Sequence, residues 1–359
     1  MFNKEKPYNE LPPLPPKIEL ETKEILKAAI EANRALAELK GIAKTIPNQS
    51  ILISTLPMQE ARSSSEIENV ITTNDKLYEA MASSANNYDP QTKEVLRYRE
   101  ALWEGYKELE KRELLTTNLY IKIYQKIKET DAGIRVTPGT KISNSKGEIV
   151  YTPPEGEHII RDKLKNLEDF IHSEDELDNL IKLALIHYQF EAIHPFTDGN
   201  GRTGRIICVL FLILKKHLEL PILYLSKYII ENKNEYYIKL RAVTENNDWH
   251  QWVFYFLNAV KETADLTANK IIQIKELVNQ TVEEAKTKLP ARVYSKELIE
   301  LIFEEPYSKT EFVVNAGIAK RQTAAEYLKE LEKAGFLKSK KVGKEVLYLN
   351  IMLQKIFIN

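Results

Sequence analysis

The sequence has a single cysteine, almost no net charge and no long apolar run, and each shortage excludes a class of protein. Cys208, the one cysteine, cannot support a disulfide framework within the chain. It lies in the longest apolar run, residues 206–214, which is far shorter than the roughly 20 residues needed to cross a bilayer. We therefore expect a core helix at this run, with Cys208 packed as a small hydrophobe, and no membrane partner.

The formal net charge of −1 excludes a global attraction to nucleic acid or to an anionic membrane, so only local patches could provide one. The amino terminus is polar and proline-rich between Pro7 and Pro16, without the basic, apolar and small-residue zones of a secretory signal. These two features predict a cytoplasmic location.

A composition of 43% hydrophobic and 29% charged residues is ordinary for a globular protein, and 359 residues are too many for one ordinary core. Apolar residues recur at helical spacing over residues 21–42, 49–61, 91–111, 116–128, 177–193, 202–217, 232–245 and 249–286. Glycines and prolines between residues 133 and 154 predict an irregular segment or a β-hairpin.

Beyond Pro290, three short helical patterns precede a basic segment and a strand-like stretch at residues 345–349. The helical patterns cover residues 294–303, 308–315 and 320–334. This succession is typical of a winged helix. The sequence therefore predicts a mostly α-helical protein with an amino-terminal helical region (1–110), a central core (111–288) and a carboxy-terminal winged helix (290–359).

The pattern at residues 177–193 is apolar on nearly all sides, which predicts a buried central helix. It ends at His194, because Pro195 disfavours helical geometry in the residue before it. The imidazole of His194 would then stand at the start of a loop, where it could take a proton from an incoming hydroxyl.

The loop after His194 combines groups that suit phosphate chemistry. Gly199 and Gly201 can turn successive N–H groups inward to form an anion-binding nest, which opens onto the amino terminus of the next helix. Arg202 and Arg205 follow at a spacing of three and could reach different phosphate oxygens. Asp198 supplies the carboxylate that a hard cation such as Mg²⁺ prefers.

Each of these residues alone has an ordinary structural explanation, since a glycine-rich turn between two helices needs no ligand. Their occurrence together within twelve positions favours a nucleotide site. The segment His-Pro-Phe-Thr-Asp-Gly-Asn-Gly-Arg-Thr-Gly-Arg, residues 194–205, resembles without departure the Fic signature HPFx(D/E)GNGRxxR.

The resemblance implies a nucleotidyltransferase that moves AMP from ATP to a protein hydroxyl, with Mg²⁺ as cofactor. It implies His194 as the base, Asp198 as the Mg²⁺ ligand, and Gly199, Asn200 and Gly201 as the phosphate cradle. Arg205 would hold the γ-phosphate and Arg202 the departing pyrophosphate. Phe196 is expected to face the core.

The likeness extends beyond the motif. Residues 185–193 are similar to the helix that precedes it in the family, and residues 151–154 are similar to the end of the family's β-hairpin flap. Tyr237 and Leu240 lie in a segment like the one that lines the adenine pocket, although Thr244 stands where some relatives have asparagine. The intact Gly201 favours AMP transfer over phosphorylation, while UMP or phosphocholine transfer stays an alternative.

The segment Ser63–Asn69 carries the pattern Ser-x-x-x-Glu-Asn, and Ser64 and Glu68 would share one helix face. By itself this short pattern suits a serine-capped helix on the surface. In Fic proteins that carry it, the glutamate pairs with the second arginine of the signature. The resemblance therefore implies that Glu68, with Ser64, inhibits the enzyme by occupying Arg205.

Several alternatives stay open at this stage. The acceptor would be a Ser, Thr or Tyr hydroxyl of another protein or of the chain itself, and a homodimer is not excluded. The Fic core could instead sense nucleotide for a DNA-binding regulator, or the same site could remove AMP. DNA contact would use the winged helix, where Lys320 and Arg321 open the third helix and lysines occupy the wing.

Overall fold

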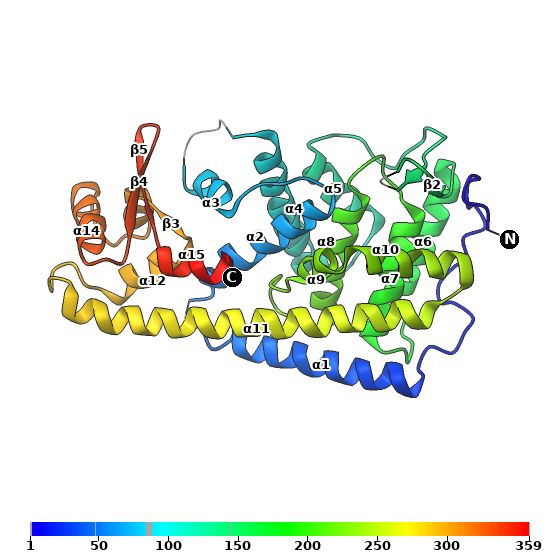
Figure 1. Ribbon diagram of the computed structural model, residues 1–359, viewed down its shortest axis with the longest axis horizontal. Helices are drawn as coiled ribbons and strands as arrows, with labels where there is room; N and C mark the ends of the chain where they lie inside the picture. The colour runs from blue at the N-terminus through cyan, green and yellow to red at the C-terminus, as the bar shows by residue number, and fades with distance from the viewer. Residues whose placement is uncertain (1, 47, 84–87, 145, 359) are drawn as a thin grey trace.

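The computed structural model describes residues 2–46, 48–83, 88–144 and 146–358, and over these ranges the chain is mostly helical (Figure 1). The elements of the amino-terminal and central parts are α1 (Lys23–Ala43), α2 (Ser50–Ile67), α3 (Asn74–Ala82), α4 (Pro90–Arg112), α5 (Thr117–Lys128), β1 (Ile142–Ser143), β2 (Ile149–Tyr151), α6 (Glu157–His172), α7 (Asn179–Ile193), α8 (Asn200–Leu214), α9 (Leu225–Glu231), α10 (Lys233–Asn246) and α11 (Trp249–Lys288). The carboxy-terminal elements are α12 (Lys296–Glu304), β3 (Tyr307–Ser308), α13 (Thr310–Asn315), α14 (Arg321–Lys333), β4 (Lys338–Val342), β5 (Glu345–Leu349) and α15 (Ile351–Ile358).

Each helical pattern found in the sequence coincides with a helix, so the mostly α-helical prediction is confirmed. Among the helices of the described ranges, four were not predicted, namely α3, α6, α9 and α15. For α6 the signal was present, because Ile160, Leu164, Leu167 and Ile171 are buried at helical spacing. The pattern at 49–61 also proved too short, since α2 continues to Ile67 and includes Ser64, while Glu68 follows it as the C-cap residue.

The helix α7 forms the centre of the molecule, as predicted. Asp178 starts it by accepting hydrogen bonds from the backbone N–H groups of Leu180 and Ile181. Almost all of its side chains are buried, and it ends at His194, whose φ of 50° leaves the helical range just before Pro195. The neighbouring α8 is equally buried and contains the apolar run with Cys208, which confirms the core helix. No helix of the described residues is long and apolar enough to cross a membrane.

The long helix α11 runs along the base of the molecule from the central core to the carboxy-terminal unit, with α1 beside it (Figure 1). The predicted β-hairpin is present as β1 and β2, which pair antiparallel with Ile142 opposite Tyr151. In the carboxy-terminal unit, β3 lies between α12 and α13, and the hairpin of β4 and β5 follows α14. The three strands form an antiparallel sheet of order β3-β5-β4, the arrangement expected of a winged helix.

The carboxy-terminal unit packs against the amino-terminal helices. Lys340, on strand β4 of the wing, forms ion pairs with Asp75 at 2.9 Å and Glu79 at 2.6 Å, both on α3. The helix α15 ends beside the same helix, where Asn74 donates to the carbonyl of Phe357. The division into units at 1–110, 111–288 and 290–359 stays a prediction, and contacts of this kind would be lost if the last unit were removed.

Candidate active site

His194 stands at the carboxyl end of α7 in the left-handed region, with φ 50° and ψ 58°. Such a conformation is uncommon for a residue other than glycine and often marks a functional position. Its Nδ1 is buried and has no hydrogen-bond partner among the described residues. Burial, followed by the nearby charge of Arg135, lowers the pKa of His194 to about 4. The imidazole is therefore neutral at pH 7, the form that a general base requires.

The loop between α7 and α8 is closed by its own side chains. Asn200 accepts a hydrogen bond from the N–H of Phe196 and donates one to its carbonyl, each at 2.8 Å. The ring of Phe196 is buried, as predicted, and stacks on Tyr124 with a centroid separation of 4.1 Å. The side chain of Asn200 is thus used to hold the loop. Its backbone N–H is the group that Asn200 could offer to a phosphate.

The two glycines of the loop do different work. Gly199 adopts a φ of 76°, which a side chain would strain, and it immediately precedes α8. Gly201 was expected to share this freedom, and that expectation was wrong, because Gly201 lies in the first turn of α8 without a positive φ. A Cβ at Gly201 would overlap Oε1 of Glu68 and lie 2.9 Å from Nη1 of Arg205. Its glycine therefore leaves room for a carboxylate and a guanidinium.

Arg205 is held by both residues of the Ser64 motif. Its Nε donates to Oγ of Ser64, and its Nη2 donates to the carbonyl of Ser64 and to Oε1 of Glu68, each at 2.8 Å. Although burial would lower it, the Glu68 carboxylate raises the pKa of Arg205, which is cationic throughout the physiological range. The Arg205 side chain is 1% exposed and that of Glu68 is 33% exposed, so the carboxylate has access to solvent and the guanidinium has none.

The helix that carries Glu68 is fixed in the core. Glu60 on α2 is buried and accepts hydrogen bonds from the N–H and the hydroxyl of Ser226 and from the hydroxyl of Tyr98. Glu68 itself lies just past the end of α2, and the next residue, Asn69, has a φ of 62°. The body of α2 is therefore anchored, and Glu68, just beyond its last residue, reaches the solvent.

Arg202 and Asp198 belong to a separate charged cluster that the sequence analysis did not find. Glu94 on α4 binds the buried guanidinium of Arg202, and Lys128 at the end of α5 lies 2.7 Å from Oδ2 of Asp198. Despite burial, Lys128 lowers the pKa of Asp198, so this carboxylate is ionised. Glu94 is 108 positions from Arg202, and no local spacing in the sequence could have linked them.

The predicted adenine-pocket residues lie on α10. Tyr237 is 40% exposed, and its ring packs edge-on against the buried Tyr236 at 5.1 Å. Leu240 is partly buried against the core. The hydroxyl of Tyr236 lies 2.9 Å from Nε2 of His187 on α7, so α10 is joined to the central helix below the loop. Burial raises the pKa of Tyr237, the charge of Glu68 adds to this and that of Arg205 opposes it. The α10 helix therefore lies near Glu68 and Arg205.

Glu191 is a titratable group of this site that the sequence did not single out. It lies one turn before His194 on α7, and its Oε1 is buried without a partner among the described residues. Oε1 would be 2.7 Å from a Cβ at Gly204, so that glycine makes room for it. Burial raises the pKa of Glu191 to about 7, with Arg205 opposing the shift and Glu68 adding to it.

A pH dependence of stability follows from Glu191. Its pKa is about 7 in the folded chain and 4.5 as an ordinary glutamate, so wild type should lose stability as pH rises from about 5 to 8. Glu191→Gln should remove this pH dependence. Between pH 5 and pH 8, its free energy of unfolding should rise by about 1–3 kcal/mol relative to that of wild type, because the variant lacks the unsatisfied buried charge. Urea unfolding at several pH values measures it, with the exposed Glu176→Gln as control. A parallel offset of the Glu191→Gln curve at every pH would contradict the assignment.

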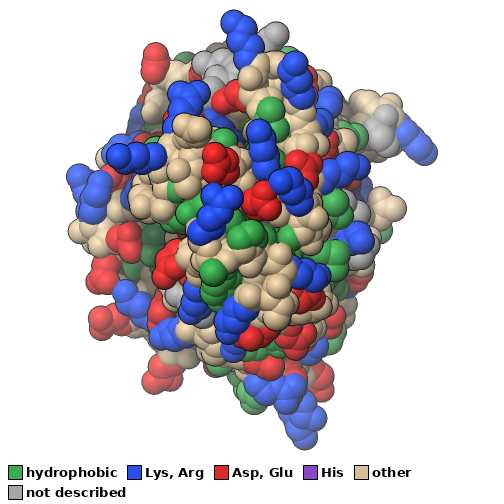
Figure 2. Space-filling model, turned by 90° about the vertical axis from the view of Figure 1, so that its left-hand side faces the viewer, with side chains coloured by type: hydrophobic (Ala, Val, Ile, Leu, Met, Phe, Trp, Pro, Cys, Tyr) green, Lys and Arg blue, Asp and Glu red, His purple; other side chains and the backbone are tan. Residues whose placement is uncertain are grey.

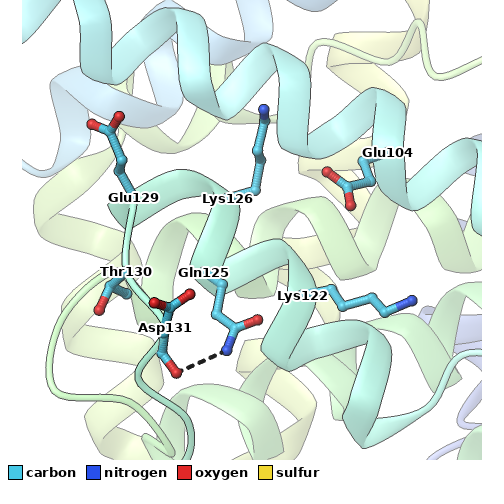
Figure 3. Close-up of a pocket in the computed structure, with 7 residues that line it drawn as sticks. All are labelled: Glu104, Lys122, Gln125, Lys126, Glu129, Thr130 and Asp131. Atoms are coloured by element: carbon cyan, nitrogen blue, oxygen red, sulfur yellow. Dashed lines mark hydrogen bonds between the residues drawn. The ribbon is translucent and has the colours of Figure 1, made fainter.

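An open hollow on the outer side of α4 and α5 is separate from this cluster (Figure 3). It is lined by charged and polar side chains, namely Glu104, Lys122, Gln125, Lys126, Glu129, Thr130 and Asp131. Gln125 donates to the carbonyl of Asp131 across it. None of the residues singled out in the sequence lines this hollow, and we assign it no part in the chemistry.

Comparison with known sequence families places the loop and its surroundings in one family. The Fic/DOC family pattern matches residues 114–212, which include α7, the loop and most of α8. The Fic/DOC family N-terminal pattern matches residues 26–107, and the pattern of the SoFic-like protein adenylyltransferase C-terminal domain matches residues 277–353. The chain belongs to the Fic/DOC family. The three matches follow one another along the chain and together cover most of this Fic protein.

Curated relatives are similar over shorter stretches of this Fic protein. It is 30% identical over 132 residues to the protein adenylyltransferase fic-1 of Caenorhabditis elegans, which covers 33% of the chain and 24% of that protein. It is 27% identical over 143 residues to a probable protein adenylyltransferase of Aquifex aeolicus, covering 40% of the chain and 42% of that protein. The chain thus spans less than half the length of these relatives.

Solved structures share the fold over a larger part of the chain. A Fic family protein from Desulfovibrio desulfuricans matches with a TM-score of 0.60 and 19% identity, over 93% of this chain and 98% of that one. Fic-1 from C. elegans matches with a TM-score of 0.54 and 17% identity, over 71% of this chain and 74% of that one. At these identities the likeness extends to the fold alone.

Proposed function

We propose that this Fic protein is a protein adenylyltransferase, which transfers AMP from ATP to a hydroxyl side chain of a protein. The proposal is supported by the names of the relatives, protein adenylyltransferases in both cases, and by the complete signature at residues 194–205. The single observation that carries it is the position of His194, which is neutral and lies at the end of α7, just before the glycine turn that leads into the amino terminus of α8. The backbone N–H groups at that terminus suit a polyphosphate.

In this mechanism His194 accepts the proton of a Ser, Thr or Tyr hydroxyl while the hydroxyl oxygen attacks the α-phosphorus of ATP. The bond from the α-phosphorus to the bridging oxygen breaks, and pyrophosphate leaves. Gly199, Asn200 and Gly201 would offer backbone N–H groups to the phosphates, and Arg205 would bind the γ-phosphate once Glu68 releases it. Arg202, which now pairs with Glu94, would bind the departing pyrophosphate. Tyr237 and Leu240 would border the adenine.

The residues present fit Mg²⁺ as a cofactor. Asp198 is ionised, its side chain is 64% exposed, and it adjoins the glycine turn. An ion at this place would be held by the carboxylate together with phosphate oxygens, the ligands that Mg²⁺ prefers. Mg²⁺ would neutralise charge on the polyphosphate. Lys128 forms an ion pair with Asp198, so the ammonium group of Lys128 would have to move when a metal–nucleotide complex binds.

Asp198→Ala should lower AMP transfer on the order of 100-fold at saturating ATP and abolish its response to Mg²⁺ concentration, because charge on the polyphosphate would lack its bridging cation. Incorporation of α-labelled AMP over a Mg²⁺ titration measures this. Asp162→Ala, which removes an exposed carboxylate from α6, is the control. Unchanged Mg²⁺ dependence in Asp198→Ala would exclude Asp198 as the ligand.

Contact with DNA through the winged helix stays a prediction, and the structure gives it limited support. Lys340, one of the lysines of the wing, is already paired with Asp75 and Glu79. Lys and Arg side chains on this end of the molecule are interspersed with Asp and Glu, without a continuous basic face (Figure 2). We therefore place ATP and a protein acceptor ahead of DNA as partners.

The decisive experiment incubates the purified protein and its Glu68→Gly form with α-labelled ATP, alone and in host lysate. Label on protein supports adenylyl transfer, and label on the chain itself identifies self-modification. A protein that only senses nucleotide would bind ATP and leave no label. An enzyme that removes AMP would instead release label from protein that had been modified beforehand, with Glu68 orienting a water, and Glu68→Gly would stop that release.

A further inference from the structure

Arg135 lies outside every motif of the sequence, in the connection between α5 and the β-hairpin, and it is 4% exposed. Its backbone N–H donates to the carbonyl of Pro195 at 2.9 Å. This bond brings the connection directly against the residue that follows His194.

The guanidinium of Arg135 binds three backbone carbonyls. Nε donates to the carbonyl of His194 at 2.8 Å, and Nη2 donates to the carbonyls of Pro154 and, at 3.5 Å, of Ile193. The carbonyls at the end of a helix have no partner within the helix, and the dipole of the helix favours a cation there. Arg135 therefore caps α7 where His194 leaves the helical conformation.

The contact with Pro154 connects the same residue to the flap, the β-hairpin with its trailing residues 152–154. Tyr151 at the end of β2 also reaches α7, since its hydroxyl donates to the carbonyl of Ala192 at 2.8 Å. The flap and the carboxyl end of α7 are therefore joined by two side chains, of which only Arg135 also contacts the residue proposed as base.

The charge of Arg135 is not balanced by an ion pair among the described residues, whose salt bridges involve other cations. Burial lowers the pKa of Arg135, and Glu155 and Tyr151 oppose this. The charged groups that act on His194 are Arg135, which lowers its pKa after burial, and Glu68 and Asp198, which raise it. Burial is the main cause of the lowered pKa of His194, and the charge of Arg135 adds to it.

We propose that Arg135 is a positioning residue for AMP transfer, which fixes the backbone of His194 against the flap so that the base and the acceptor hydroxyl meet in line. This inference rests on the proposed function. A misplacement of about 1 Å in such a site costs about 100-fold in rate. The carbonyls that Arg135 holds belong to Ile193, His194 and Pro154 and lie outside the glycine turn proposed to bind the phosphates, so ATP binding should be spared.

The test compares Arg135→Met and Arg135→Lys in the full chain carrying Glu68→Gly, with Arg161→Met, an exposed arginine of α6, as the matched control. Arg135→Met should lower kcat about 100-fold and leave KM for ATP within about twofold. Arg135→Lys should recover part of the rate, since it keeps the charge but not the fork of donors. Thermal unfolding of each variant shows that the fold is retained at the assay temperature.

A second readout does not depend on activity. The protein is labelled with ¹³C-histidine, the His194 resonance is assigned from the spectrum of His194→Ala, and its titration is followed by NMR without nucleotide. Arg135→Met should raise the pKa of His194, whereas Arg161→Met should not. If Glu68→Gly itself transfers no AMP, the proposed function fails while this titration still tests the contact. An unchanged kcat, an equal loss of kcat and ATP affinity, or an unshifted His194 titration would overturn the role of Arg135.

Discussion

Replacing His194 by alanine should reduce AMP transfer by about 100- to 10,000-fold, the range that a general base contributes, and leave ATP affinity nearly unchanged. The reason is that the neutral imidazole at the end of α7 would move a proton and hold no phosphate. The variant is best made in the Glu68→Gly form, in which the unblocked rate is high enough to measure the loss. Incorporation of α-labelled AMP gives the rate, and calorimetric titration with Mg-ATP gives the affinity.

The matched control is His187→Gln, a change in a buried histidine of the same helix that contacts Tyr236 and not the loop. It should alter the rate far less than His194→Ala does. A His194→Ala protein that still transfers AMP at more than a tenth of the parent rate would end the assignment of His194 as base.

Replacing Glu68 by glycine should raise AMP transfer by about 10- to 100-fold at saturating ATP and Mg²⁺. The estimate follows from freeing one charge-assisted hydrogen bond, worth about 1.5–3 kcal/mol, for the γ-phosphate. Glu68 and that phosphate would compete for the single guanidinium of Arg205, which Glu68 holds at 2.8 Å. Freed, Arg205 would align the α-phosphate with the incoming hydroxyl, so kcat should change more than KM.

Two further variants make this prediction specific. Glu66→Gly places the same change in the last turn of α2, where Glu66 lies 3.9 Å from Arg62 and not against Arg205, and it should not activate. Adding Arg205→Ala to Glu68→Gly should cancel the gain and give the rate of Arg205→Ala alone. Because Arg205 is buried, its variants need a thermal unfolding curve beside the rate. Equal rates for wild type and Glu68→Gly would refute the inhibitory role.

The anchoring of α2 bears on how such inhibition could be relieved. Glu60 is buried with partners on α4 and α9, so withdrawing the whole helix would leave a carboxylate unpaired in the core. Glu68 lies beyond the last turn and reaches solvent. A rotation of this one side chain would free Arg205 from Glu68, while Ser64 would keep its two hydrogen bonds to the guanidinium.

Local patterns predicted much of the fold. Helical periodicity located α4, α5, α7 and α11 to within a few residues, because a buried helix face repeats every few positions. It failed for α3 and α9, which are short, and for α15, which is also short and whose position against α3 depends on residues distant in the sequence. The glycines and prolines alone predicted only an irregular segment or a hairpin for the flap, since its strands have two and three residues, and the β-hairpin was expected from the family resemblance.

By itself the sequence determined the chemistry that the loop can offer and the family to which it belongs. His194, Asp198, the glycines and both arginines lie within twelve consecutive positions, so their residue types, together with the family resemblance, were enough to predict a role for each. The tertiary structure alone decided which groups these residues contact. Glu94 forms an ion pair with Arg202, and Lys128 forms one with Asp198. Glu68 and Ser64 bind Arg205, and Arg135 caps the helix that presents His194. These contacts join segments far apart in the chain, and only the packing of the helices, which no local spacing encodes, brings them within bonding distance.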